Sequence, residues 1–117
     1  MNMKNNLEKV IITGGAGFIG SNLADHLFAN GTKEILIIDD FSTGSERNIE
    51  HLENINVIDS RVEDIQDLEN KLMGYNFCFH LAAGVGVKYI MEMLASINTN
   101  IEHSQILCMS SDIDLYS

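Results

Sequence analysis

Four glycines fall within the seven residues GGAGFIG, at positions 14–20, and no other feature of the chain restricts its fold as much. Inside regular structure a glycine costs about 0.5–1 kcal/mol relative to alanine, so the cluster implies an unusual backbone path or the close approach of another group. Residues 8–13 predict a strand before the glycines, and residues 18–30 predict a helix after them, with Gly31 as its carboxyl-terminal stop. The predicted order is therefore strand, glycine turn and helix.

Strands and helices are predicted to alternate along the rest of the chain. We expect strands at residues 34–39, 56–59 and 76–81, a short helix at 48–52, and longer helices at 65–73 and 89–108. The unbroken isoleucines and leucines near position 36 suit a strand that is buried on both faces. The pattern predicts an α/β fold over residues 1–117: a Rossmann-type, doubly wound parallel sheet that is incomplete, with strand order 3-2-1-4.

The composition narrows the classes of partner. The net charge is −10 and only seven residues are Lys or Arg, which argues against nucleic-acid binding through neutralised phosphates. The apolar runs are far shorter than the roughly 20 residues needed to cross a bilayer, so no membrane partner is expected. The chain has two cysteines, Cys78 and Cys108, and its amino terminus has no hydrophobic segment. These features favour a cytoplasmic location, with Cys78 acting as a small core residue.

The spacing of the glycines fits a dinucleotide fingerprint. Gly14, Gly17 and Gly20 form G-x-x-G-x-x-G, Gly15 adds an overlapping G-x-G-x-x-G, and Asp39 follows 19 residues after Gly20. In this arrangement Gly17 leaves space for a diphosphate at the helix start, and Gly20 lets the helix pack closely on the strand. The carboxylate of Asp39 would accept hydrogen bonds from both ribose hydroxyls and repel a 2′-phosphate. NAD is therefore the expected cofactor, in preference to NADP.

A plainer interpretation treats the glycines as an ordinary tight turn and Asp39 as a solvated strand end. The joint placement of strand, helix and acid favours the dinucleotide over this alternative. His80 follows apolar residues in a predicted buried strand, so a hydrogen-bonded structural histidine is expected there. The four histidines are too scattered to suggest a metal site, and we expect none.

Several ordered motifs resemble the amino-terminal cofactor half of the extended short-chain dehydrogenases/reductases, the NAD-dependent nucleotide-sugar epimerases and dehydratases. These motifs are TGGAGFIGS at residues 13–21, DDFSTG at 39–44, HLAA at 80–83 and NTNI at 98–101. The resemblance covers nearly the whole chain. It implies a truncated NAD-binding domain whose full-length relatives act on a nucleotide-sugar substrate by epimerisation, dehydration or decarboxylation.

The resemblance also implies roles for individual residues. Phe18 and Ile19 would lie under the pyrophosphate, and the remaining residues would contact the ribose, the adenine or the flank of the cofactor, or brace the central helix. The implied cofactor-binding set is Gly14, Gly17, Phe18, Ile19, Gly20, Asp39, Ser42, Thr43, Val62, Leu81, Ala82, Ala83 and Asn100. Arg61 replaces the acid that accepts a proton from the adenine amino group in the family, and an arginine only donates. Stacking of Arg61 on the ring is the alternative.

The chain departs most from the family in its chemistry. The family uses a Tyr-x-x-x-Lys pair, but Tyr75, Tyr89 and Tyr116 have no lysine four residues later, so we expect no catalytic residue. The tail MSSDIDLYS faintly resembles a strand that carries a catalytic Ser or Thr in the family. We interpret it as a coincidence or a deletion, because about ten residues after Asn100 are too few for a helix and a return.

Two functions therefore remain open. The chain is either the cofactor-binding portion of an epimerase or dehydratase, inactive alone, or a non-catalytic NAD-binding or regulatory module. In both cases the fourth predicted strand would present an open apolar edge, because the sheet is incomplete. Such edges pair with other chains, so a homo-oligomer is an expected partner state.

Overall fold

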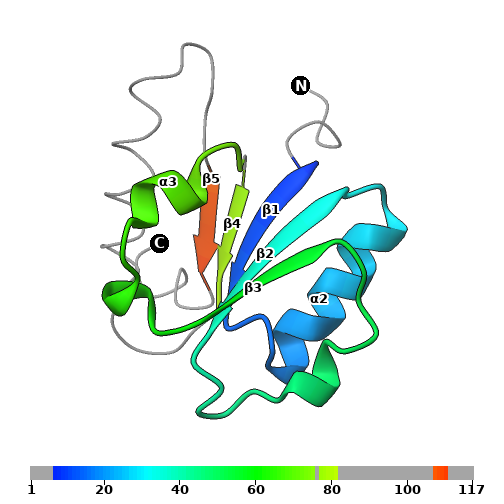
Figure 1. Ribbon diagram of the computed structural model, residues 1–117. Coiled ribbons are helices and arrows are strands. Elements are labelled where there is room, and N and C mark those ends of the chain that lie inside the picture. Colours follow the sequence, from blue (N-terminus) through cyan, green and yellow to red (C-terminus); the bar gives the residue numbers. More distant parts are fainter. Residues whose placement is uncertain (1–6, 76, 82–106, 111–117) are drawn as a thin grey trace.

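A parallel five-stranded sheet forms the centre of the computed structural model, which describes residues 7–75, 77–81 and 107–110 (Figure 1). Its strand order is β3-β2-β1-β4-β5, and each neighbouring pair is parallel. The strands are β1 (Lys9–Thr13), β2 (Glu34–Asp39), β3 (Ile55–Asp59), β4 (Phe77–His80) and β5 (Leu107–Ser110). The described helices are α2 (Phe18–Ala29) and α3 (Leu68–Leu72), with 3-10 turns η1 (Glu46–Asn48) and η2 (Val62–Asp64).

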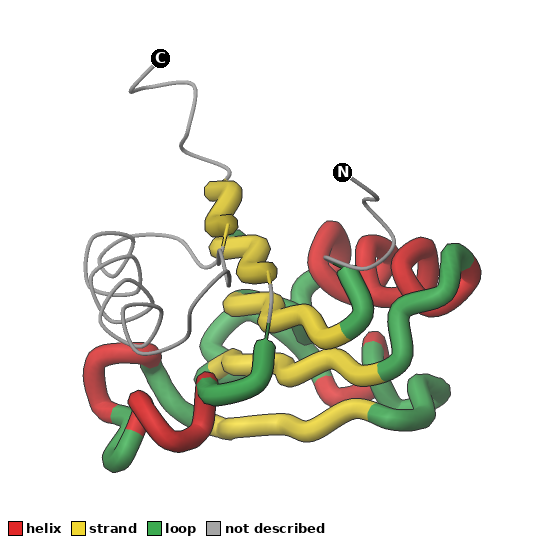
Figure 2. The backbone as a smooth tube through the Cα atoms, turned by 90° about the horizontal axis from the view of Figure 1, so that it is seen from above, coloured by secondary structure: helices red, strands yellow, loops and turns green. Residues whose placement is uncertain are grey.

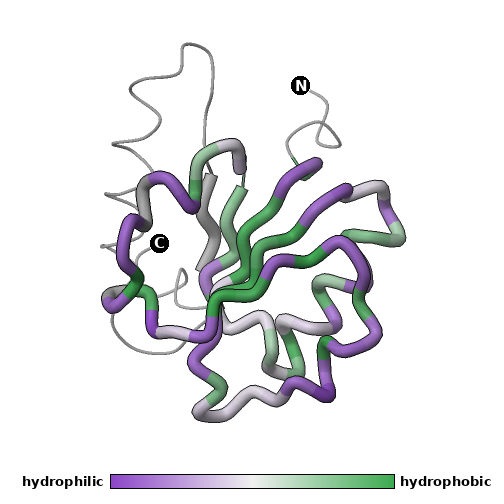
Figure 3. Tube along the Cα trace, in the orientation of Figure 1, coloured by the Kyte–Doolittle hydropathy of each residue, from purple (hydrophilic) through white to green (hydrophobic). Residues whose placement is uncertain are grey.

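Both faces of the sheet are covered, as the doubly wound prediction requires. Ile35 and Ile37 of β2 pack in the core cluster on the side of α2, whereas Leu36 and Ile38 pack in the cluster on the side of α3. Figure 1 shows α2 and α3 on opposite sides of the sheet, and the strands form one layer in Figure 2. The hydrophobic positions are concentrated in the strands (Figure 3). This burial on both faces explains the unbroken apolar sequence of β2.

The first half of the fold agrees closely with the sequence-based prediction. The strand predicted at 34–39 is confirmed as β2, and the helix predicted at 18–30 is α2, which ends one residue earlier, at Ala29. Asn30 caps its carboxyl end, and Gly31 follows with a φ of 104°, a left-handed value that favours glycine. No helix in the described ranges is long and apolar enough to cross a membrane.

Two helix predictions were wrong in their extent. The helix predicted at 65–73 is reduced to α3, because Asp67 takes a left-handed conformation, with a φ of 57°, and interrupts the helical path. The short helix predicted at 48–52 is instead η1, which starts earlier because the Oγ of Ser45 accepts a hydrogen bond from Arg47 N–H.

The prediction for the carboxyl-terminal part of the chain needs a larger correction. Most of the helix predicted at 89–108 lies outside the described residues, but its last two residues belong to the strand β5. This strand pairs with β4 in parallel, with Phe77 opposite Leu107 and His80 opposite Ser110. The order 3-2-1-4 therefore extends by a fifth strand, and β4 is not an open edge. The homo-oligomer inferred from that edge loses its physical basis, because backbone groups of β4 are paired within the chain.

A polar cluster ties the amino-terminal ends of the strands together. The Tyr75 hydroxyl donates a 2.7 Å hydrogen bond to Oε2 of Glu34, and the Asn56 amide donates to the same oxygen at 3.2 Å. The Lys9 Nζ lies 5.3 Å from the centroid of the Tyr75 ring. Burial, together with the Glu34 carboxylate that accepts a hydrogen bond from the hydroxyl, raises the pKa of Tyr75 to about 12.

Tyr75→Phe is expected to lose less stability than the wild-type chain as the pH rises above about 10. Because the pKa of Tyr75 is raised to about 12 in the fold, its contribution is complete below about pH 10 and is lost as the pH rises through about 12. The wild-type chain should therefore lose roughly 1–2 kcal/mol more than Tyr75→Phe between these pH values. Urea unfolding of both proteins at several pH values measures the difference. Parallel pH profiles would contradict the prediction.

Candidate functional site

The predicted site residues gather at the carboxyl-terminal edge of the sheet. The glycine loop connects β1 to α2, Asp39 ends β2, and η2 follows β3. The strands β1, β2 and β3 are adjacent and parallel, so the loops that follow them share one edge. In open α/β sheets this edge is where ligands bind.

The glycine loop is a compact turn in which Gly14, Gly15 and Gly20 cannot be replaced without strain or a clash, since a Cβ on Gly15 would lie 2.8 Å from the Ile37 side chain. Gly14 has a φ of 73°, and its N–H donates a 2.7 Å hydrogen bond to Ile38 O, which anchors the loop to β2. A Cβ on Gly20 would lie 2.5 Å from Gly14 O and 2.8 Å from the Cα of Gly15. A Cβ on Gly17, in contrast, would make only an ordinary contact, 3.4 Å from Gly14 O. The fold itself therefore requires Gly20 but tolerates a methyl group at Gly17.

The amino terminus of α2 has neither a capping side chain nor an acidic residue. Gly17 occupies the N-cap position without a side-chain hydrogen bond, and the first turn of the helix contains no Asp or Glu. The first intrahelical bond runs from Ser21 N–H to Gly17 O at 2.9 Å. The N–H groups of the first turn have no carbonyl four residues earlier within the helix, and the positive end of the helix dipole lies there. This end of α2 is suited to an anion.

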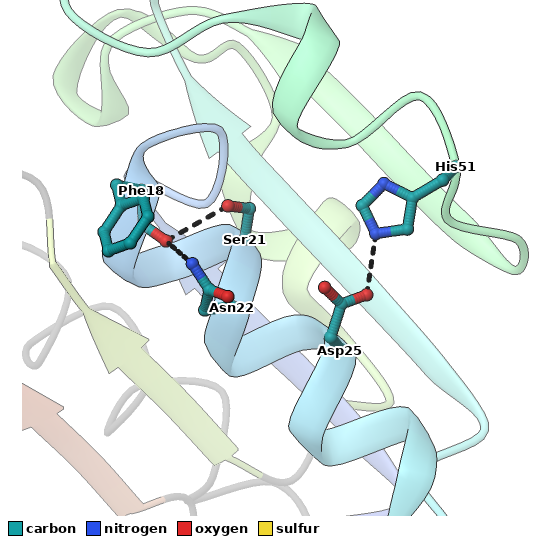
Figure 4. Close-up of polar contacts among 5 residues, drawn as sticks. All are labelled: Phe18, Ser21, Asn22, Asp25 and His51. Atoms are coloured by element: carbon teal, nitrogen blue, oxygen red, sulfur yellow. Dashed lines mark hydrogen bonds and ion pairs between the residues drawn. The ribbon is translucent and has the colours of Figure 1, made fainter.

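Two large apolar side chains stand at this helix start. Phe18 is 78% exposed and Ile19 is 71% exposed. The carbonyl of Phe18 accepts hydrogen bonds from the Ser21 hydroxyl at 3.1 Å and the Asn22 amide at 2.7 Å, as Figure 4 shows. The polar side chains of Ser21 and Asn22 therefore bond back to the helix, whereas the apolar side chains of Phe18 and Ile19 are exposed.

Asp39 is not a solvated strand end. It is only 9% exposed, and its Oδ2 accepts a 3.0 Å hydrogen bond from Ala16 N–H while its Oδ1 accepts a 2.8 Å hydrogen bond from Phe41 N–H. The plainer interpretation of Asp39 is therefore wrong. Each carboxylate oxygen retains a further lone pair for a ligand hydroxyl. The two backbone donors fix the orientation of the carboxylate before any ligand arrives.

A second carboxylate and a cation lie beside this acid. Asp40 is exposed, and its Oδ1 accepts hydrogen bonds from the Ser42 hydroxyl at 2.7 Å and the Ser42 N–H at 3.0 Å. These bonds lower the pKa of Asp40, and the nearby positive charge of Arg61 lowers it further. Thr43 is exposed in the same loop. The site edge therefore carries two neighbouring carboxylates, with the positive charge of Arg61 near the exposed one.

The other predicted site residues lie at different depths. Val62 is 5% exposed and packs in the core cluster on the α3 side. Leu81 is half-buried, and its N–H donates a 3.0 Å hydrogen bond to Thr13 O at the end of β1. Ala82, Ala83 and Asn100 lie outside the described residues. The structure thus brings the glycine loop, α2 and Asp39 together, with Ser42 and Thr43 on the adjoining loop.

The sequence-based reasoning missed the residues that hold the glycine loop from outside. The Ala16 carbonyl accepts hydrogen bonds from Ser45 N–H at 3.0 Å and from the Asn48 amide at 2.8 Å. A Cβ on Gly44 would lie 2.9 Å from both Ala16 C and Asp39 Oδ2, so this segment packs directly on the site. The signal was the segment SERN at residues 45–48, immediately after DDFSTG, because Ser and Asn are residue types that often bond to nearby backbone.

The buried histidine and cysteine have structural roles. His80 is 0% exposed and shares a 2.6 Å hydrogen bond between its Nδ1 and Thr13 Oγ1, which confirms the structural interpretation. Cys78 is also 0% exposed and belongs to the core cluster on the α3 side. Within the part of the chain that the structure describes, no three His, Cys, Asp or Glu side chains form a group that could hold a metal ion.

A doubly wound parallel sheet with a glycine turn after β1 and an acid at the end of β2 defines a Rossmann-type nucleotide-binding domain. The family model described as GDP-mannose 4,6 dehydratase matches residues 11–107, and the chain belongs to this family. The resemblance to the extended short-chain dehydrogenases/reductases is confirmed.

Curated relatives of the chain are UDP-sugar decarboxylases. A UDP-N-acetyl-alpha-D-glucosaminuronate decarboxylase from Bacillus cytotoxicus is 38% identical over 97 residues, which are 81% of this chain and 30% of that protein. UDP-glucuronic acid decarboxylase 4 from Arabidopsis thaliana is 32% identical over 102 residues, which are 86% of this chain and 22% of that protein. The chain therefore spans less than a third of the length of these two relatives.

Solved structures with the same fold include a complex with NAD. WbmG of Bordetella bronchiseptica in complex with NAD is 37% identical, with a TM-score of 0.57 over 66% of this chain and 25% of that chain. A UDP-N-acetylglucosamine 4-epimerase from Methanobrevibacter ruminantium, in complex with UDP-N-acetylmuramic acid, is 36% identical, with a TM-score of 0.57 over 80% of this chain and 30% of that chain.

Proposed function

We propose that this chain binds NAD as the amino-terminal cofactor-binding portion of an NAD-dependent nucleotide-sugar epimerase/dehydratase. The observation that carries the proposal is the orientation of the Asp39 carboxylate, held by Ala16 N–H and Phe41 N–H beside the uncapped start of α2. A diphosphate needs the helix amides and an adenosine ribose needs the acid. Structures of similar proteins, including WbmG, contain NAD, which supports the choice of ligand.

Different residues of the site would contact different parts of the dinucleotide. The diphosphate would meet the first-turn N–H groups of α2, where Gly17 leaves space that no side chain fills. Phe18 and Ile19 would be covered by the ligand, which accounts for the exposure of 78% and 71% of these apolar residues. Asp39 would accept hydrogen bonds from the ribose hydroxyls. Bound there, NAD supplies a hydride acceptor for the chemistry of the longer enzyme.

The adenine end of the ligand would lie beyond Asp39, near η2. Arg61, at the N-cap of η2, is exposed and can stack on a purine ring, although it cannot accept a proton from the adenine amino group. Val62 is buried beneath this surface, so its proposed contribution is to support the ring rather than to cover it. Ser42 and Thr43 would flank the ribose from the loop after β2. Ala82, Ala83 and Asn100 keep the roles that the family resemblance implies for them.

The reaction of the longer protein would be epimerisation, dehydration or decarboxylation of a nucleotide-activated sugar. UDP-sugars are the proposed substrate class, because the curated relatives are UDP-sugar decarboxylases. We propose a cytoplasmic location. A non-catalytic NAD-binding or regulatory module is the second candidate.

Calorimetric titration of the 117-residue chain with NAD and with NADP tests the proposal. NAD is expected to bind at least about tenfold more tightly than NADP, because two carboxylates, Asp39 and Asp40, would face the extra phosphate. Equal affinities, or no binding of NAD, would contradict the proposed function. Incubation with NAD and UDP-glucuronic acid is expected to give no NADH, and NADH formation by the chain alone would exclude the non-catalytic module and contradict the expectation that the cofactor-binding portion is inactive alone.

A further inference from the structure

Three residues from outside the glycine loop hold the two peptide groups that flank Ala16: Asp39 binds the Gly15–Ala16 peptide, and Ser45 and Asn48 bind the Ala16–Gly17 peptide. We call Asp39, Ser45 and Asn48 the Ala16 clamp. Asp39 Oδ2 accepts from Ala16 N–H at 3.0 Å, and the Ala16 carbonyl accepts from Ser45 N–H at 3.0 Å and from Asn48 Nδ2 at 2.8 Å. Both lone pairs of this carbonyl are therefore in use.

The segment that carries the clamp is itself anchored. Ile49 follows Asn48 and is 5% exposed in the core cluster on the α2 side. Farther along, His51 Nε2 lies 2.7 Å from Asp25 Oδ1 of α2, the pair that Figure 4 shows at the middle of the helix. The Asn48 side chain thus acts from a segment that is attached to both the core and α2. Its bond to Ala16 crosses 32 positions of sequence.

The clamp acts immediately before Gly17, whose own carbonyl accepts the first intrahelical bond, from Ser21 N–H at 2.9 Å. Because a peptide group is planar, fixing the Ala16 carbonyl also fixes the direction of Gly17 N–H, which donates to Gly14 O at 3.2 Å. Gly17 is the N-cap of α2, with φ −77° and ψ 174°, and it has no Cβ to limit its rotation. Rotation at Gly17 would turn the next amide, that of Phe18, away from a ligand at the helix start.

We propose that Asn48 is a positioning residue for the diphosphate of the dinucleotide. Its amide holds the Ala16–Gly17 peptide so that the first amides of α2 keep their direction toward the phosphate oxygens. Asn48 does not contact the ligand in this proposal. The inference rests on the proposed function, because it needs a diphosphate at the start of α2.

Asn48→Ala in the 117-residue chain tests the inference with three ligands: NAD, ADP and adenosine. The dissociation constants of NAD and ADP are expected to rise about fivefold to tenfold, the usual effect of one lost hydrogen bond, while that of adenosine changes by less than about twofold. Calorimetry gives the first two constants and NMR titration the third. Amide hydrogen exchange of Gly17 and Phe18 should become faster in the variant.

Asn30→Ala is the matched control. The Asn30 amide also donates a 2.8 Å hydrogen bond to a backbone carbonyl, that of His26, but at the opposite end of α2. All three affinities should stay within about twofold of wild type in this control. Asn48→Asp provides a second variant of nearly the same shape, which removes the donor without leaving a cavity, and it should weaken ADP binding at least as much as Asn48→Ala.

The possible outcomes distinguish a failure of the proposed function from a failure of the positioning role of Asn48. If wild type binds neither NAD nor ADP, the proposed function fails and the inference fails with it. If wild type binds both, but the Asn48 variants bind ADP as well as wild type does, only the positioning role is overturned. A proportional loss for NAD, ADP and adenosine would also overturn it, because a purely structural role affects all ligands alike.

Discussion

Asp39→Ala is expected to weaken NAD binding by one to two orders of magnitude and to destabilise the fold at the same time. The affinity is lost because hydrogen bonds from ligand hydroxyls to a charged group contribute roughly 1.5–3 kcal/mol. The stability is lost because Ala16 N–H and Phe41 N–H, which donate to the carboxylate at 3.0 and 2.8 Å, would lose their acceptor. Two unsatisfied backbone donors of this kind should cost about 2–4 kcal/mol.

Two further variants separate these effects. Asp39→Asn keeps an acceptor oxygen for one of the two N–H groups, so it should lose less stability than Asp39→Ala. It should also bring the affinities for NAD and NADP closer together, because the charge that repels a 2′-phosphate is gone. Asp59→Asn is the matched control, since Asp59 is the exposed register partner of Asp39 on β3. Calorimetry on folded protein that shows unchanged NAD affinity in Asp39→Ala would remove Asp39 from the site.

The burial of Asp39 is the part of the site that the sequence could not predict. The glycine spacing and the position of the acid follow from local patterns, and the structure places both at the same edge of the sheet. The two hydrogen bonds that hold the carboxylate depend on how the backbone of Ala16 and Phe41 folds around it. Such bonds arise from loop geometry, which the spacing of residue types does not encode.

The elements of the fold were predictable where local and tertiary preferences agree. β2 is a run of isoleucine and leucine, and its bounds were correct because any position in it suits a strand buried on both faces. α3 was overestimated because the left-handed conformation of Asp67 breaks a pattern that still looks helical. β5 was missed because the likeness of the tail MSSDIDLYS to a strand of the family was interpreted as a coincidence or a deletion, whereas Leu107–Ser110 forms a strand that pairs with β4, a contact between distant parts of the chain. A nearest-neighbour pattern contains no signal for that pairing.

Gly20→Ala is expected to destabilise the fold more than an alanine at any other glycine of the loop. The new Cβ would lie 2.5 Å from Gly14 O and 2.8 Å from Gly15 Cα, and both are backbone atoms that cannot move aside cheaply. Overpacking of this kind costs typically 1–3 kcal/mol or more, so we expect a loss of about 3 kcal/mol and a fall in Tm of roughly 10 °C or more. Thermal unfolding followed by circular dichroism measures it.

Gly17→Ala is expected to keep the stability of the fold and to weaken ligand binding. Comparison with Gly20→Ala tests why the chain concentrates glycine here. Its Cβ would lie 3.4 Å from Gly14 O, and its φ of −77° is open to any residue, so the free energy of unfolding should change by less than about 1 kcal/mol. The methyl group would instead stand where the diphosphate approaches the helix amides. We expect NAD and ADP affinities to fall at least about tenfold while the fold is kept. If Gly17→Ala binds NAD normally, the space at Gly17 serves the turn alone, and the diphosphate must lie elsewhere.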